Sequence, residues 1–164
     1  MRFLGIIFLV LFVSCNSQGQ SKLEKTLKLY NSESIPYIHV KELAILDNVL
    51  LLDTREKDEF AVSHLKNAIW VGYDTFNKKT VSSKAINKNT PIVVYCSIGV
   101  RSENIGEVLV EMGYTNVKNL YGGIFDWKNK DQPVFDMQDL ETEKVHAYDK
   151  QWGKLLKKGE KIFK

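Results

Sequence analysis

The residues with the clearest chemical potential lie between positions 91 and 102, which read PIVVYCSIGVRS. The apolar, β-branched run at 92–95 is typical of a strand buried on both faces, and Cys96 follows it directly. A helical pattern begins near Ser102. In open α/β sheets the ligand crevice lies at the carboxyl ends of the strands. We therefore expect Cys96 to occupy a tight loop between a buried strand and a helix, where such folds bind ligands.

The predicted surroundings of Cys96 favour a nucleophilic thiolate. Backbone N–H groups of a curled loop and of a helix N-terminus point toward an anion, and this field lowers the pKa of a thiol. Arg101 adds a permanent charge and planar donors that suit oxyanions. The loop residues expected to bind the anionic substrate are Ser97, Ile98, Gly99, Val100, Arg101 and Ser102. The alternative is structural, because a cysteine after an apolar strand is often a small buried hydrophobe.

Composition limits the class of protein. The chain has 164 residues, 44% hydrophobic and 26% charged, which fits one globular domain with short extensions. The formal net charge of +3 is small and dispersed, so it gives no indication of nucleic-acid binding. The two cysteines and three histidines form no zinc-like spacing, so we predict no metal site.

The first fifteen residues are predicted to be a targeting segment. Arg2 precedes an apolar run at 3–13 that is too short to span a membrane as a mature helix. Ser14 and Cys15 resemble the end of a bacterial lipoprotein signal, in which the cysteine is lipidated and becomes the new N-terminus. The resemblance implies an exported lipoprotein, anchored through Cys15 to a membrane on its periplasmic or outer side. A plain secretory signal, with Cys15 incidental, is the alternative.

Lipidation of Cys15 would leave Cys96 as the only thiol of the mature protein. Exported proteins occupy compartments in which free thiols are oxidised. A single unpaired cysteine in such a protein is therefore a candidate reactive thiol.

The remaining sequence alternates strand and helix patterns. Strands are expected at 37–40, 49–53, 67–71, 92–95 and 117–120, and helical segments at 41–46, 55–63, 81–86 and 101–112. This alternation predicts a parallel sheet with right-handed crossovers. Residues 16–34 should be a linker with a short helix at 23–30. Residues 136–164 should be a basic helical extension, with a helix at 140–156 packed through Val145, Trp152 and Leu155.

Four charged or titratable residues follow the second predicted strand. Asp53, Arg55, Glu59 and His64 are expected to form a structural brace of ion pairs and hydrogen bonds rather than to act in catalysis. The helix at 55–63 should be capped by Asp53 or Thr54 and should turn Phe60 inward.

Three motifs occur in a fixed order: the Asp53 to Leu65 segment, the Cys96 to Arg101 loop, and Gly-Gly-Ile-x-x-Trp ending at Trp127. Together they resemble the rhodanese-like sulfurtransferase domain over about residues 35–135. The resemblance implies an α/β fold with a small parallel five-stranded sheet and helices on both faces. It also implies transfer of sulfane sulfur from thiosulfate or a persulfide to cyanide or a thiol through a Cys96 persulfide, without a metal or organic cofactor. The expected partners are a small sulfur-containing anion and a low-molecular-weight or protein thiol acceptor.

Two other functions remain open. The domain could be a persulfide carrier or protein-binding module without free turnover. It could also be a Cys-dependent phosphatase or arsenate reductase, although the four residues between Cys96 and Arg101 make a shorter loop than related phosphatases have.

Overall fold

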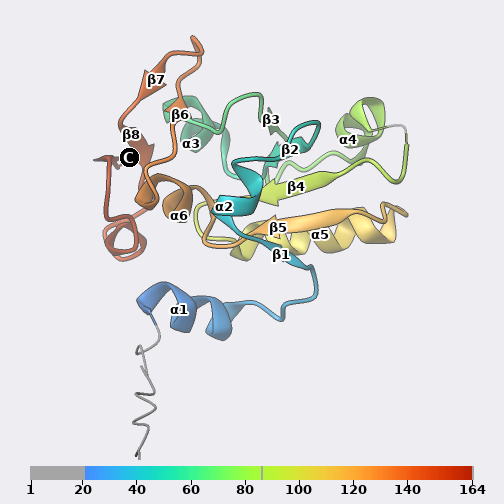
Figure 1. The fold of residues 1–164 in the computed structure, drawn as a ribbon, viewed down its shortest axis with the longest axis horizontal. Coiled ribbons are helices and arrows are strands. Elements are labelled where there is room, and N and C mark those ends of the chain that lie inside the picture. Colours follow the sequence, from blue (N-terminus) through green and yellow to red (C-terminus); the bar gives the residue numbers. More distant parts are fainter. Residues whose placement is uncertain (1–20, 86, 164) are drawn as a thin grey trace, which may run out of the picture.

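The computed structural model describes residues 21–85 and 87–163, so Cys15 and the predicted signal segment lie outside the described residues. Five parallel strands form one sheet in the order β1-β5-β4-β2-β3 (Figure 1). Their bounds are β1 (Tyr37–Ile38), β2 (Leu50–Asp53), β3 (Ile69–Trp70), β4 (Ile92–Tyr95) and β5 (Val117–Leu120). The predicted five-stranded parallel sheet is confirmed. β1 and β3, at the two edges, are shorter than predicted.

Helices cover both faces of the sheet, as predicted. Successive residues of a strand point to opposite faces of the sheet, so the side chains of β4 pack in two different clusters. Val93 and Tyr95 pack in a cluster with α2 (Val40–Leu43) and α6 (Gly123–Asn129). Ile92 and Val94 pack in a second cluster with α4 (Lys78–Lys84) and α5 (Val100–Glu111). β4 therefore lies at the centre of the sheet and of the core.

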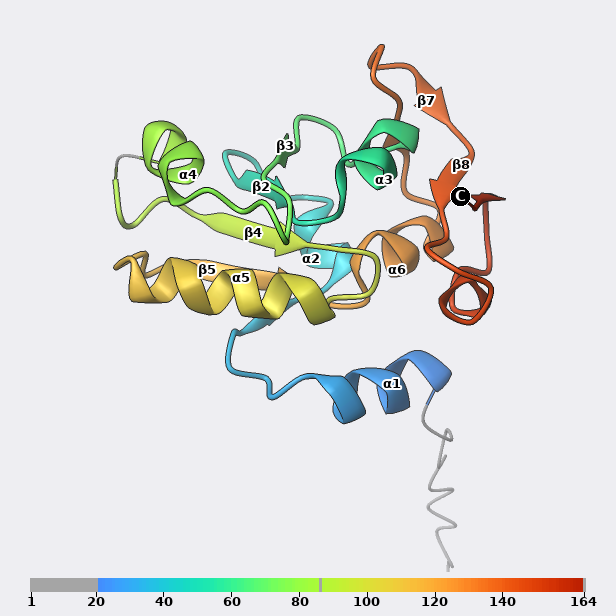
Figure 2. The same cartoon turned by 180° about the vertical axis from the view of Figure 1, so that it is seen from behind.

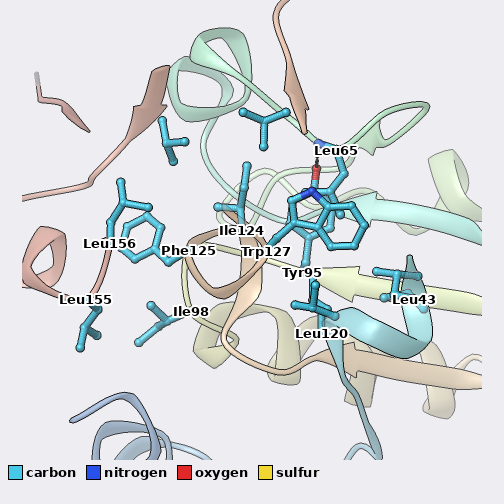
Figure 3. Close-up of a cluster of buried hydrophobic side chains, with 14 of the residues drawn as sticks. Leu43, Leu65, Tyr95, Ile98, Leu120, Ile124, Phe125, Trp127, Leu155 and Leu156 are labelled. Atoms are coloured by element: carbon cyan, nitrogen blue, oxygen red, sulfur yellow. Dashed lines mark hydrogen bonds between the residues drawn. The ribbon is translucent and has the colours of Figure 1, made fainter. Parts of the chain in front are cut away.

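Both chain extensions contribute to the first of these clusters. Leu155 and Leu156, from the C-terminal segment, are buried with the α6 side chains Phe125 and Trp127 (Figure 3). Leu27, from α1 (Lys22–Tyr30), belongs to the same cluster. In the same cluster the backbone N–H of Leu65 donates to the hydroxyl of Tyr95 at 3.2 Å. The extensions thus pack into the hydrophobic core of the domain.

The predicted helix at 140–156 is wrong. The segment instead contains two short strands and a 3₁₀ turn, η1 (Trp152–Lys154). β7 (Glu141–Thr142) pairs with β6 (Val134–Phe135), and β8 (Lys144–His146) pairs with β9 (Glu160–Ile162). The carboxylate of Asp149 accepts hydrogen bonds from the backbone N–H groups of Gln151 and Trp152, at 2.7 and 2.8 Å. Such local bonds compete with helix formation. Val145 and Leu155 are nevertheless buried, as predicted.

The helix after β2 differs from its prediction in two details. It is α3 (Lys57–Val62), and its first turn is closed by Glu59, whose carboxylate accepts from the N–H of Glu56 at 3.0 Å; Asp53 and Thr54 do not cap it. Glu59 is the residue that α3 buries, whereas Phe60 is only partly buried and stacks on His64 with ring centroids 4.1 Å apart. In the described ranges, no helix has the length and apolar character needed to cross a membrane.

Candidate active site

The loop from Cys96 to Gly99 joins the carboxyl end of β4 to the N-terminus of α5. Gly99 has φ +110°, a backbone conformation that residues other than glycine rarely adopt. Its N–H donates to the sulfur of Cys96 at 3.1 Å. The Gly99 carbonyl accepts from the side-chain amides of Asn119, at 2.8 Å, and Asn31, at 3.0 Å. These bonds hold the peptide group that follows Gly99, next to the one whose N–H points at the sulfur.

The electrostatic surroundings of Cys96 favour the thiolate. Burial raises the pKa of the thiol, but the charge of Arg101 and hydrogen bonds from Ser102 and from the Gly99 N–H lower it further than burial raises it. The pKa of Cys96 therefore lies below its usual value. Ser102 lowers the pKa mainly through its backbone N–H, whereas its hydroxyl donates its single proton to the side-chain oxygen of Asn119 at 2.8 Å. Among the predicted loop residues, Arg101 therefore has the largest stabilising effect on the thiolate, followed by Ser102 and Gly99.

Arg101 is held by a buried carboxylate. Its two terminal nitrogens bond the two oxygens of Glu59 at 2.7 and 2.9 Å, and one of them also bonds the Ser97 hydroxyl at 3.1 Å. The Ser97 hydroxyl in turn donates to Glu59 at 3.0 Å. Burial raises the pKa of Glu59, but Arg101, with a smaller contribution from Arg55, lowers it to about 2. The Glu59 carboxylate therefore stays ionised and orients Arg101 beside Cys96.

The structure does not bring the four predicted brace residues into one group. Asp53 and Arg55 form a fully buried ion pair, with an Arg55 terminal nitrogen 2.6 Å from an Asp53 oxygen. The same nitrogen donates to the Ser63 carbonyl at 2.6 Å. His64 lies with its Nδ1 3.2 Å from the Phe60 carbonyl oxygen. Glu59 does form an ion pair, as described above, but with Arg101 of the active loop, which the sequence did not predict.

Cys96 lines a cavity of about 170 Å³, although only 1% of the residue is exposed. The loop contributes Ser97, Ile98, Val100 and Arg101 to the cavity wall, and the extensions contribute Tyr30, Tyr148 and Trp152. The three aromatic residues lie outside the motifs, and the sequence offered no signal for them. Within residues 21–85 and 87–163, no three His, Cys, Asp or Glu side chains gather as they would around a metal ion.

The first turn of α6 holds the active loop through backbone hydrogen bonds. The N–H groups of Ile124 and Phe125 donate to the carbonyls of Cys96, at 3.0 Å, and Ser97, at 3.1 Å. Gly123 lies against this backbone, and a Cβ atom there would come within 2.8 Å of the Ile98 nitrogen and closer still to the Cys96 carbonyl oxygen. The glycine therefore permits α6 to approach the active loop.

We expect Gly123→Ala to destabilise the protein and to lower the reactivity of Cys96. The variant combines a positive φ of 54° with a clash against backbone that cannot move without displacing the loop. Gly113→Ala is the matched control, because its φ is +89° but nothing lies within 4 Å of its Cβ. Strain alone should cost the control about 1–2 kcal/mol in unfolding free energy. Equal losses in both variants, measured by denaturant unfolding, would show that α6 does not support the loop.

We expect the pH dependence of Cys96 alkylation to shift when the charge of Arg101 is removed. The thiolate fraction rises as pH rises through the pKa, so the lowered pKa puts the midpoint of the wild-type rate profile below that of an ordinary cysteine. Arg101→Gln removes the largest pKa-lowering effect while Cys96 stays buried, so its midpoint should move to higher pH. Lys84→Gln, in α4, is the control and should not shift it. An unmoved midpoint in Arg101→Gln would contradict this electrostatic account.

Comparison with known proteins agrees with this geometry. A model of the rhodanese-like domain matches residues 39–130, more than half of the chain. The chain belongs to the rhodanese-like domain family. A thiosulfate sulfurtransferase, GlpE of Coxiella burnetii, is 29% identical over 96 residues, which cover 58% of this chain and 87% of that protein. The adenylyltransferase and sulfurtransferase UBA4 of Candida albicans is 34% identical over 85 residues, covering 49% of this chain and 19% of that protein.

A solved structure gives the same fold. The rhodanese-like chain superimposes on a thiosulfate sulfurtransferase from Pseudomonas aeruginosa with a TM-score of 0.58 and 21% identity, covering 74% of this chain and 23% of the other. The related sequences also include a tRNA uridine(34) hydroxylase of Photorhabdus laumondii, 35% identical over 52% of this chain and 26% of that protein. The comparisons therefore establish the family and the fold, and they leave the particular reaction to be argued from the site.

Proposed function

We propose that this rhodanese-like protein is a sulfurtransferase that carries sulfane sulfur on Cys96. The observation that supports this most strongly is the convergence of the Gly99 N–H, Ser102 and the Arg101 charge on the Cys96 sulfur, which lowers its pKa. These groups stabilise a negative sulfur in the free enzyme. They are equally suited to the terminal sulfur of a persulfide, much as an oxyanion hole stabilises oxygen.

The first half-reaction loads the enzyme. The Cys96 thiolate attacks the outer sulfur of the donor, the donor S–S bond breaks, and the leaving group departs with its electron pair. With thiosulfate the leaving group is sulfite; with a persulfide it is a thiolate. Cys96 then carries one additional sulfur.

The second half-reaction unloads it. Cyanide or an acceptor thiolate attacks the terminal sulfur, the Cys96 S–S bond breaks, and the Cys96 thiolate is regenerated. The products are thiocyanate or an acceptor persulfide. Because the two substrates react in separate steps through a covalent enzyme, ping-pong kinetics are expected.

Thiocyanate production from a sulfane donor and cyanide tests this proposal. Multiple turnovers with parallel lines in double-reciprocal plots support a sulfurtransferase. A single stoichiometric release of sulfur would indicate a carrier that needs a dedicated protein acceptor. Failure to load Cys96 with any sulfane donor would overturn the proposal.

Phosphatase chemistry fits the site less well. The loop has four residues between Cys96 and Arg101, and Arg101 is engaged by both oxygens of Glu59. A phosphate dianion would have to compete with that carboxylate for the guanidinium. We expect no hydrolysis of p-nitrophenyl phosphate, and catalytic hydrolysis that Cys96→Ser abolishes would favour a phosphatase.

We also propose that the protein is exported and anchored through lipid on Cys15. This proposal is supported by the sequence alone, in which Arg2, an apolar run and Ser14-Cys15 occur in that order. Bacterial cells that express the full chain should incorporate radiolabelled palmitate into it, and Cys15→Ser should remove the label while Cys96→Ser retains it. Labelling that is independent of Cys15 would contradict the anchor.

A further inference from the structure

Three aromatic side chains from outside the family match line the outer part of the cavity of Cys96. Tyr30 ends α1, and Tyr148 and Trp152 belong to the C-terminal segment, whereas the family match covers residues 39–130. We call these three residues the aromatic roof. Figure 2 shows that α1 and the C-terminal segment both lie at the end of the sheet toward which β4 points.

The aromatic roof is joined across the two extensions and to the active loop. Tyr30 and Trp152 pack edge to face with ring centroids 5.5 Å apart. The ring of Tyr148 lies over the guanidinium of Arg101, with 5.4 Å between the ring centroid and the guanidinium carbon. The N-terminal and C-terminal extensions therefore meet above the nucleophile.

The volume of the cavity limits the size of a group that can lie against Cys96. The cavity measures about 170 Å³, and Cys96 is almost completely hidden from solvent. For comparison, an engineered protein cavity of about 150 Å³ binds benzene. A donor of about that size reaches the sulfur with the roof in place. The substituent of a peptide-sized persulfide exceeds this volume.

The charges around the cavity limit the charge of a substrate. Arg101 is the charged residue among the described side chains that line it, and Glu59 compensates that charge through two hydrogen bonds. The Cys96 thiolate is itself negative. Because aromatic walls solvate an ion poorly, the transfer of a dianion from water costs more than that of a monoanion.

We infer that the aromatic roof restricts Cys96 to compact sulfane-sulfur donors with at most one negative charge, such as a small alkyl persulfide. Thiosulfate, a dianion, and peptide-sized persulfides are disfavoured. This inference rests on the proposed sulfur transfer and names its donor class. In the reaction the Cys96 thiolate attacks the outer sulfur of R–S–SH, the S–S bond breaks, and RS⁻ leaves. The product is Cys96–S–SH, without net oxidation or reduction.

Alkylation of Cys96 tests the roof without relying on sulfur transfer. The full chain is treated with iodoacetamide, iodoacetate or N-(1-pyrenyl)iodoacetamide, and the Cys96 peptide is quantified by mass spectrometry. Each rate is divided by the rate of the same reagent with N-acetylcysteine. We expect the bulky reagent to be slower than iodoacetamide by about tenfold, which corresponds to about 1.4 kcal/mol, and the monoanionic iodoacetate to stay within about threefold of iodoacetamide.

Opening the roof should remove the size restriction. Trp152→Ala should raise the normalised rate of the pyrenyl reagent by about tenfold and leave that of iodoacetamide within about threefold. Trp152→Phe, which retains an aromatic ring, should stay near the wild type. Leu140→Ala is the control, because Leu140 is exposed in the same extension and does not line the cavity. Tyr30→Ala is a second variant to be measured if thermal unfolding shows that Trp152→Ala does not fold.

Two results would overturn the inference: equal normalised rates of the small and bulky reagents in the wild type, or no acceleration in a folded Trp152→Ala or Tyr30→Ala protein. Loading of Cys96 by methyl persulfide, glutathione persulfide and thiosulfate, followed by intact mass, then tests the donor class. Faster loading by methyl persulfide supports the inference, and equal loading by all three overturns it. No loading by any donor would instead refute the proposed sulfurtransferase, while the alkylation ratios still decide the role of the roof.

Discussion

Cys96→Ser is expected to abolish sulfur transfer. The variant retains nearly the same size and keeps the loop, but a serine hydroxyl is not ionised near neutral pH and does not form a stable persulfide. The loss in kcat/KM should be on the order of 10⁴-fold or more, as for removal of other covalent nucleophiles. Thiocyanate formation from a sulfane donor and cyanide provides the measurement.

The other cysteine of the chain provides the matched control. Cys15→Ser should leave transfer intact, because Cys15 lies outside the catalytic domain in sequence. Thermal unfolding of Cys96→Ser should remain close to that of the wild type, which separates loss of chemistry from loss of fold. Retained transfer in the Cys96→Ser protein would contradict the covalent mechanism.

Asp53→Ala is expected to cause a large loss of stability. Asp53 and Arg55 are both fully buried, and the Arg55 guanidinium depends on that carboxylate for its charge compensation. Removing one partner of a buried pair leaves an uncompensated charge and costs about 3–5 kcal/mol in unfolding free energy. Denaturant-induced unfolding measures this difference directly.

An exposed ion pair within the same chain is the control. Lys28 and Glu24 lie 3.4 Å apart on the surface of α1. Lys28→Ala should cost no more than about 0.5 kcal/mol, because solvent screens such pairs. Replacing both buried partners, in Asp53→Ala/Arg55→Met, should recover part of the loss. A loss in Asp53→Ala as small as in Lys28→Ala would show that the buried pair does not stabilise the fold.

Local sequence patterns predicted the centre of the fold well. The strand at 92–95 has the bounds of β4, and the strand at 117–120 has those of β5. The first is a short apolar run, and the second, VKNL, has apolar residues at both ends; each is bounded by turn residues, so its conformation depends on nearby sequence and burial. The position of Cys96 at the carboxyl end of a central strand followed from this pattern.

Interactions between distant residues were not visible in the sequence. Glu59 bonds Arg101, 42 positions away, whereas the sequence pattern predicted a brace with Asp53, Arg55 and His64. Tyr30 and Trp152 meet only because both extensions fold back over the sheet. The helical pattern after Leu140 failed for a local reason, because the Asp149 carboxylate bonds the backbone N–H groups that follow it.

The burial of Cys96 decides whether its sulfur can act as a nucleophile. A sealed cysteine with N–H groups directed elsewhere would have left no nucleophile. The Cys96 side chain is buried, but the Gly99 N–H points at its sulfur and the residue lines a cavity. Burial here therefore accompanies a stabilised thiolate, and the aromatic roof lines the same cavity.

The most direct test of the central claim is the intact mass of the protein after treatment with a sulfane donor and removal of the excess. A covalent sulfur intermediate predicts an addition of about 32 Da, the mass of one sulfur atom, on the peptide that contains Cys96. Cyanide should then remove the added mass and release thiocyanate. An unmodified Cys96 peptide after exposure to methyl persulfide, glutathione persulfide and thiosulfate would contradict the account.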